Sequence, residues 1–219
     1  MRRDAKLIYV GDPMCSWCWG IAPALKEVRQ HYDDRGIGFE IIAGGLRPGG
    51  GDPWDEQMKS FLRHHWAEVT ARSGQPFGYD LFDRDEFNYD TEPACRAVVT
   101  AKGLLDEAGT LRFFEAVQRK FYVDNEDPSE VSFYESICKA SGIDFGDFSA
   151  RFHSDALREQ TRQEFLLNRQ WGVKGYPTLV LQFQEQLFLV TNGFATALVM
   201  KDRIDQLLEE APISASDTK

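Results

Sequence analysis

The chain has 219 residues, of which 42% are hydrophobic and 27% charged, enough for a sizeable core in one large domain or one domain with an insertion. Its formal net charge is -10 and it has no basic block, which argues against a nucleic-acid partner or an anionic membrane surface. The N-terminal segment has neither the apolar stretch nor the cleavage site of a signal peptide, so we expect a cytoplasmic protein without a membrane span.

The first residues predict a strand, a helix and a second strand. Residues 7–10 form a short apolar run that Gly-Asp-Pro closes, as is typical of a buried strand. Apolar residues then recur at helical spacing from Ile21 to Tyr32. Residues 37–46 supply the next strand. Two cysteines, Cys15 and Cys18, therefore lie at the start of the predicted helix.

The middle of the chain, residues 48–151, shows almost no strand signal and several helical patterns. These cover residues 54–69, 91–105 and 111–121, with Thr91 as the N-cap of the second. A further helix is predicted to begin at Asp127 and Pro128 and to end at Gly142. We therefore expect an all-helical insertion subdomain over residues 48–151.

The remaining residues complete an α/β fold. A helix is predicted from Ser154 to Trp171, followed by strands at 178–183 and 187–194 that form a hairpin, and by a closing helix at 197–208. Residues 1–47 and 152–211 then make one α/β domain, which the helical insertion interrupts. Residues 212–219 are expected to form a flexible tail.

The segment Cys15-Ser16-Trp17-Cys18 is typical of either a redox pair or half of a metal site. A helix N-terminus favours the thiolate at Cys15, and Cys18 is close enough to attack a mixed disulfide formed there. A zinc site needs four ligands, yet Cys95 and Cys138 are isolated and the histidines show no ligand spacing. We expect a redox pair with Cys15 as nucleophile and Cys18 as resolving thiol, and no metal.

Several other residues are candidates for substrate contact. Pro177 either simply begins a strand or forms a cis-proline loop against the cysteines, in which case the backbone of Tyr176 faces them. Trp17 is expected to be more exposed than Trp19 and to form an apolar wall for the substrate. The full set of predicted contacts is Met14, Trp17, Tyr176 and Pro177, with Gly45, Arg47, Thr91 and Glu92 as possible contacts for glutathione or another substrate.

Together, "DPMCSWCWG", "AGGLRP", "TEPACRAV" and the Gly-Tyr-Pro-Thr segment resemble the DsbA-like branch of the thioredoxin superfamily, within it the cytoplasmic predicted protein-disulfide isomerases related to FrnE. The resemblance implies a thioredoxin-like fold with a helical insertion. It also implies a thiol–disulfide oxidoreductase acting on protein or small-molecule disulfides, without a bound cofactor, for which glutathione is a reductant or cosubstrate. Ser16-Trp17 replaces the Pro-His of periplasmic DsbA, so a strongly oxidising potential is not implied.

Two alternatives stay open. Kappa-class glutathione transferases and 2-hydroxychromene-2-carboxylate isomerases begin with a similar Asp-x-x-Ser pattern, and here Asp12-Pro13-Met14-Cys15 carries cysteine at the serine position. Such an enzyme does not require Cys18, and the presence of Cys18 argues against this reading. The kappa-like relatives also suggest a homodimer. The second alternative is a binding module with this fold and no catalytic turnover, against which the intact cysteine pair argues.

Overall fold

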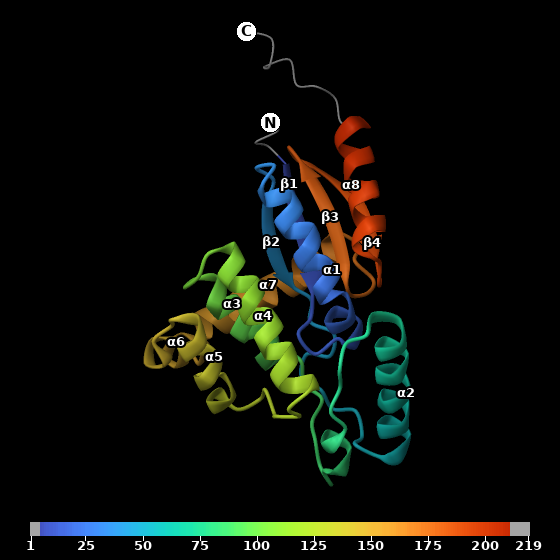
Figure 1. The fold of residues 1–219 in the computed structure, drawn as a ribbon. Coiled ribbons are helices and arrows are strands. Elements are labelled where there is room, and N and C mark those ends of the chain that lie inside the picture. The colour runs from blue at the N-terminus through green and yellow to red at the C-terminus, as the bar shows by residue number, and fades with distance from the viewer. Residues whose placement is uncertain (1–4, 211–219) are drawn as a thin grey trace.

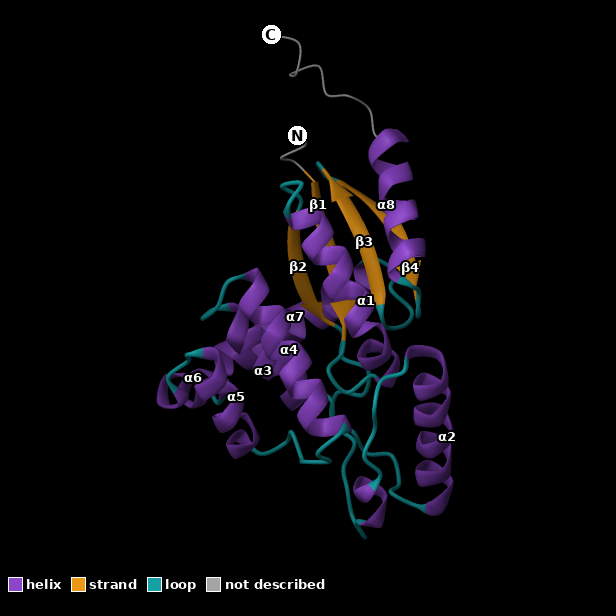
Figure 2. Cartoon of the chain, in the orientation of Figure 1, coloured by secondary structure: helices purple, strands orange, loops and turns teal. Residues whose placement is uncertain are grey.

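A computed structural model describes residues 5–210, which are built on a mixed four-stranded sheet (Figure 1, Figure 2). Its strands are β1 (Ala5–Gly11), β2 (Gly38–Ala43), β3 (Thr178–Phe183) and β4 (Gln186–Asn192). They lie in the order β2-β1-β3-β4, with β1 parallel to β2 and antiparallel to β3, and β3 antiparallel to β4. This arrangement confirms the predicted α/β fold, in which segments from both ends of the chain share one sheet.

Helices cover both faces of this sheet (Figure 1). α1 (Ser16–Asp33) and α8 (Ala197–Glu210) pack on one face, and α7 (Asp155–Gln170) packs on the other. Successive side chains of a strand point to opposite faces. The residues of β1 therefore enter the two cores in turn, namely Leu7, Ile8, Tyr9 and Val10. Because β1 is buried on both sides, it is a rigid base for the loop that carries the cysteines.

Between β2 and α7 the described chain forms helices and loops and no strand. In Figure 1 the elements α3 to α6 gather beside the β2 side of the sheet, whereas α2 stands apart from them near the start of α1. The helices of this segment are α2 (Glu56–Ser73), η1 (Asp80–Asp83), α3 (Glu92–Lys102), α4 (Glu107–Tyr122), η2 (Val131–Tyr134), α5 (Glu135–Ser141) and α6 (Phe145–Phe152). The structure thus has the predicted helical insertion, while the subdomain limits at 48 and 151 stay a prediction.

The predicted helix start at Asp127 and Pro128 is wrong. The Asp127 carboxylate accepts a hydrogen bond from the N–H of Ser129 at 2.9 Å, which closes a local turn, and α5 begins only at Glu135. Gly142 ends α5 as predicted, in the left-handed conformation with φ 72°. Asp127 therefore has the side chain of a helix cap but uses it in a turn.

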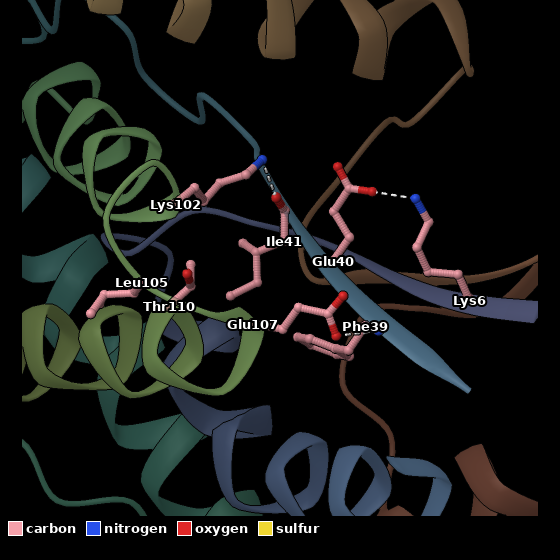
Figure 3. A pocket seen from close by; sticks show the side chains of 8 residues that line it. All are labelled: Lys6, Phe39, Glu40, Ile41, Lys102, Leu105, Glu107 and Thr110. Atoms are coloured by element: carbon pink, nitrogen blue, oxygen red, sulfur yellow. Dashed lines mark hydrogen bonds and ion pairs between the residues drawn. The ribbon is translucent and has the colours of Figure 1, made fainter. Parts of the chain in front are cut away.

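The outer edge of β2 is covered by charged side chains. An edge strand exposes N–H and C=O groups to which another chain could pair. Glu107 Oε2 accepts from the N–H of Phe39 at 2.9 Å, and Lys102 Nζ donates to the carbonyl of Ile41 at 2.6 Å (Figure 3). A hollow of about 180 Å³ lies among these residues. It adjoins the beginning of β2, at the opposite end of the sheet from Cys15, so it is not part of the thiol site.

Two further expectations concern the C-terminal tail and membrane-spanning helices. The predicted flexible tail, residues 212–219, lies outside the described residues. In the described part of the chain, no helix combines the length and the apolar character needed to cross a lipid bilayer.

Candidate active site

Cys15 lies where the loop after β1 becomes α1. Its N–H donates to the carbonyl of Asp12 at 3.0 Å, and its own carbonyl accepts from the N–H of Trp19 at 3.1 Å. Cys15 is the N-cap residue of α1, and no side chain makes a capping hydrogen bond there. The N–H groups of the first helical turn are consequently available to stabilise negative charge on the sulfur. This is the position that the sequence predicts for the nucleophile.

The proline loop faces this cysteine. The Tyr176–Pro177 peptide bond is cis, as the cis-proline interpretation of the sequence expects. The Cys15 thiol lies 3.5 Å from the carbonyl oxygen of Tyr176, to which it donates. The Tyr176 hydroxyl in turn donates to the carbonyl of Gly44 at 2.6 Å. A Cβ atom on Gly44 would lie 2.8 Å from the Tyr176 ring, so this close approach requires glycine.

Cys18 is completely buried in the first turn of α1, and both Cys15 and Cys18 are free thiols. Burial raises the pKa of Cys18 well above its usual value, and the hydrogen bond and charge of Cys15 raise it further. The buried hydroxyl of Tyr9 acts in the opposite direction and lowers the pKa of Cys18. The structure therefore keeps Cys18 protonated next to a cysteine that sits at a helix N-terminus.

A buried carboxylate holds the cysteine loop in place. Asp12 is 0% exposed and accepts hydrogen bonds from the N–H of Met14 at 2.8 Å and from the N–H of Leu46 at 2.6 Å. The thiol of Cys95 also donates to it, at 3.3 Å. Burial raises the pKa of Asp12, and these donors lower it only in part. Asp12 thus links the residue before Cys15 to the loop that follows β2.

Asp12 gives a pH-dependent prediction. Its pKa in the folded protein is raised from 3.8, so the folded state binds this proton more tightly than the unfolded state does. The free energy of unfolding that Asp12 contributes must then fall as pH rises from 3.8 through the folded pKa. We expect the stability of the natural protein relative to Asp12→Asn to decrease as pH rises above 3.8, measured by urea unfolding at a series of pH values. A difference that stays constant or grows over this range would contradict the assignment.

The predicted substrate contacts around the thiols differ in exposure. Trp17 is partly exposed while Trp19 is 6% exposed, which confirms the predicted order of the two indoles. Met14 is 1% exposed, and its carbonyl accepts from the hydroxyl of Tyr89 at 2.8 Å. The side chain of Met14 therefore lies in the core, and only its backbone belongs to the loop that carries Cys15.

The predicted contacts of the second group lie on two segments that the structure brings together. The Thr91 hydroxyl accepts from the N–H of Arg47 at 3.0 Å, so it does not cap α3 by its side chain although Thr91 occupies the N-cap position. Gly45 has φ +74°, a conformation that favours glycine. Glu92 binds Arg96 through two hydrogen bonds of 2.9 and 3.1 Å. Its carboxylate is thereby directed to this ion pair and not to the thiols.

Comparison with known proteins identifies the family. The model of the DSBA-like thioredoxin domain family matches residues 6–210. The chain belongs to this family. A candidate protein disulfide isomerase from Nitrosomonas europaea has a similar structure with a TM-score of 0.87 and 33% sequence identity, covering 95% of this chain and 100% of that one. Family membership and this relative support an enzyme of the disulfide oxidoreductase or isomerase class.

Two solved structures of lower sequence identity share the fold, and one further protein is similar in sequence. The cytosolic disulfide reductase DsbM from Pseudomonas aeruginosa is 23% identical with a TM-score of 0.74, covering 94% of this chain and 100% of that one. A 2-hydroxychromene-2-carboxylate isomerase is 14% identical with a TM-score of 0.65, over 94% and 97% of the two chains. The ClpXP adapter protein SpxH of Bacillus subtilis is 22% identical over 81% of this chain. The match spans only 58% of that protein's length.

Sequence reasoning did not assign a role to three residues of this DsbA-like site. Asp12 offered a signal, because an aspartate between glycine and proline directly after a buried strand is well placed to bond the loop that follows. Tyr9 offered none, since a tyrosine in an apolar run is expected in the core, and Tyr89 lies between Asn88 and Asp90 without a motif that points to the site. Among the described residues, no group of three or more His, Cys, Asp or Glu side chains is placed to hold a metal ion.

Proposed function

We propose that the chain is a thiol–disulfide oxidoreductase in which Cys15 attacks the substrate and Cys18 releases it. The observation that carries the proposal is the thiol of Cys15, which lies at the N-terminus of α1 and faces the carbonyl of Tyr176 beside a cis-proline. An extended substrate segment can pair with the backbone of Tyr176 while its sulfur approaches Cys15. The N–H of Cys18 donates to the carbonyl of Cys15 at 2.9 Å, and this neighbouring cysteine is the resolving thiol of the proposal.

The reaction takes two exchange steps. The Cys15 thiolate attacks one sulfur of the substrate disulfide, forms a Cys15–substrate mixed disulfide and expels the other half as a thiolate. Cys18 then loses its proton and attacks the Cys15 sulfur, which forms the Cys15–Cys18 disulfide and releases the second substrate thiolate. Two electrons pass from the dithiol to the substrate. The same steps in reverse oxidise a substrate dithiol, and the reduction potential of the pair selects the direction.

The raised pKa of Cys18 fits the timing of the second step. Burial is the main cause, and a second cause is the hydrogen bond and charge of Cys15. When Cys15 is engaged in a mixed disulfide it carries no charge, and this second cause is removed. Cys18 then ionises more easily at the step that needs its thiolate, and stays protonated before it.

Glutathione is the substrate or reductant that we propose, together with disulfides of proteins. DsbM of P. aeruginosa, which shares the fold, has been solved with glutathione. The proposed enzyme needs no bound cofactor, since cysteine sulfurs carry both electrons. We also propose a cytosolic location, where glutathione is abundant, as for DsbM. A homodimer stays a prediction.

Replacing Cys18 by serine tests the proposed roles. Without a resolving thiol the first step proceeds and the second cannot, so Cys18→Ser should accumulate a mixed disulfide between Cys15 and glutathione. Mass spectrometry of the intact protein after exposure to glutathione disulfide should show one added glutathione, removed by dithiothreitol. Cys138→Ser, which alters another buried cysteine on α5, is the matched control and should show no accumulation.

Two further functions compete with this proposal. A glutathione-dependent isomerase is supported by the Asp12-Pro13-Met14-Cys15 segment, and its turnover should survive Cys18→Ser. A non-catalytic adapter is suggested by the name of the B. subtilis relative, and its partner binding should not depend on either thiol. Retained turnover in Cys18→Ser without a trapped intermediate would favour the isomerase and reject the oxidoreductase.

A further inference from the structure

Arg72 lies against two aromatic rings at the end of α2. Its guanidinium carbon is 5.2 Å from the ring centre of Trp17 and 5.3 Å from that of Phe194. The two rings are themselves 6.0 Å apart and tilted by 54°. A cation at these distances from ring faces is attracted by the π electrons and held in a defined orientation. Arg72 is therefore an exposed residue whose charged group lies over the rings of Trp17 and Phe194.

The packing of α2 on α1 determines that position. A Cβ atom on Gly20 would lie 2.8 Å from a methyl group of Val69 and 3.5 Å from Ser73, so the two helices approach closely because Gly20 has no side chain. Arg72 lies between Val69 and Ser73 in sequence, in the turn of α2 that contacts α1. Figure 1 shows this end of α2 beside the start of α1.

Both rings under Arg72 belong to the border of the thiol site. Trp17 is one of the two residues between the reactive cysteines. Phe194 follows Gly193, whose N–H donates to the carbonyl of Pro177 at 2.7 Å. The Cys15 thiol in turn contacts the residue before Pro177. The Arg72 guanidinium thus lies at the rim of the space in which a substrate disulfide must meet Cys15.

The charge of Arg72 has no partner among the described residues, since none of their ion pairs includes it. Glu68, one helical turn earlier, lies 3.5 Å from His64 instead. Aromatic contact occupies the flat face of a guanidinium and leaves the N–H groups at its edge free, in the geometry that binds a carboxylate through two hydrogen bonds. In a chain of formal net charge -10, this group supplies positive charge next to Trp17, the residue that precedes Cys18.

We propose that Arg72 binds a carboxylate of the substrate and selects disulfides that carry carboxylates, such as glutathione disulfide. The inference rests on the proposed oxidoreductase function and adds its substrate class. Arg72 does not touch the exchanging sulfurs. It holds one end of the substrate while the backbone of Tyr176 pairs with the segment next to the disulfide.

The test compares three disulfides of different charge in a coupled turnover assay: glutathione disulfide, neutral bis(2-hydroxyethyl) disulfide and cationic cystamine. Loss of a partly exposed carboxylate contact should raise the KM for glutathione disulfide in Arg72→Met about five-fold more than the KM for the neutral disulfide. The preference of the protein for glutathione disulfide over cystamine should decrease in Arg72→Met. Arg72→Lys keeps the charge without the planar edge and should give a smaller rise. Added salt should weaken glutathione disulfide binding in the natural protein more than in Arg72→Met.

Arg63→Met is the matched control. Arg63 is a partly exposed arginine of the same helix, and its guanidinium carbon lies 4.7 Å from the ring centre of Phe82, away from the cysteine loop. It should leave the ratio of the KM values unchanged. Equal changes for all three disulfides in Arg72→Met would mean that Arg72 only supports Trp17, and no change would mean that it has no role. Either result overturns the inference.

A binding measurement separates this inference from the proposed function. S-Methylglutathione carries the same carboxylates as glutathione but cannot exchange its sulfur. If the natural protein turns over none of the three disulfides, the oxidoreductase proposal fails, and calorimetric binding of S-methylglutathione still decides the role of Arg72. Weaker binding in Arg72→Met than in Arg63→Met supports the carboxylate contact, and equal binding or no binding in the natural protein rejects it.

Discussion

Replacing Cys15 by serine should lower the rate of disulfide exchange by more than about a thousand-fold, because a serine hydroxyl is not ionised at neutral pH and cannot form the mixed disulfide. The measurement is the reduction of glutathione disulfide, or of insulin, by the purified protein, with circular dichroism to verify that the variant is folded. Serine has the shape of cysteine, so the surrounding core should stay intact although Cys15 is only 6% exposed.

Cys138→Ser is the control for loss of a buried thiol. Burial raises the pKa of Cys138 to about 11, and this cysteine lies on α5 in the helical segment, so its removal should leave the exchange rate near that of the natural protein. Cys15→Ser also separates the two enzyme classes. The isomerase class that the Asp12–Cys15 segment resembles has serine at this position, and an enzyme of that class should retain glutathione-dependent turnover in the variant. Retained turnover there would reject Cys15 as a redox nucleophile.

Local patterns predicted the elements that support this site. The strand 178–183 agrees with β3 because β-branched and apolar residues follow a proline that fixes its beginning. The helix after Cys15 was predictable from the spacing of Ile21, Leu25 and Val28, all of which are buried in α1. These signals are contained in a few consecutive residues, and no distant part of the chain had to be known to interpret them.

The contacts that hold the site together could not be read from the sequence in this way. Asp12 accepts from Leu46, 34 residues later, and from Cys95, 83 residues later. Threonine is a residue type that often caps helices. The Thr91 hydroxyl instead accepts from the N–H of Arg47, because the fold brings that N–H next to it. Pairings of this kind depend on the final placement of loops, which short-range patterns do not determine.

The helices at residues 127–152 show a competition between local interactions. An aspartate before a proline predicts a helix start, yet the Asp127 side chain is equally suited to a turn, and here the turn is formed. The helix α6 was missed because it is only eight residues long, although its N-cap Asp144 accepts from Asp147 at 2.8 Å. A cap residue alone does not fix a helix when the apolar stripe behind it is this short.

Glu164→Ala should lower the free energy of unfolding by about 3 kcal/mol, because it leaves the N–H of Ala43 without an acceptor and the Lys102 cation without its counter-ion. Glu164 is 8% exposed on α7 and accepts from the N–H of Ala43 at the end of β2 and from Lys102 Nζ, each at 2.6 Å. Burial raises the pKa of Glu164, and the charge of Lys102 offsets only part of that rise. Burying the ion pair therefore costs free energy, but removing one partner costs more because the other charge is then left unpaired. Urea unfolding measures the loss.

Two other variants of α7 serve as controls for the stability loss expected in Glu164→Ala. Glu159→Ala removes an exposed carboxylate paired with Arg162 and should change stability little. Glu164→Gln keeps an acceptor for the N–H of Ala43 and should lose less than Glu164→Ala. Ala43 precedes Gly44, whose carbonyl binds the Tyr176 hydroxyl, so freeing this end of β2 should also slow exchange at Cys15. A stability loss in Glu164→Ala no larger than in Glu159→Ala would show that β2 does not depend on Glu164.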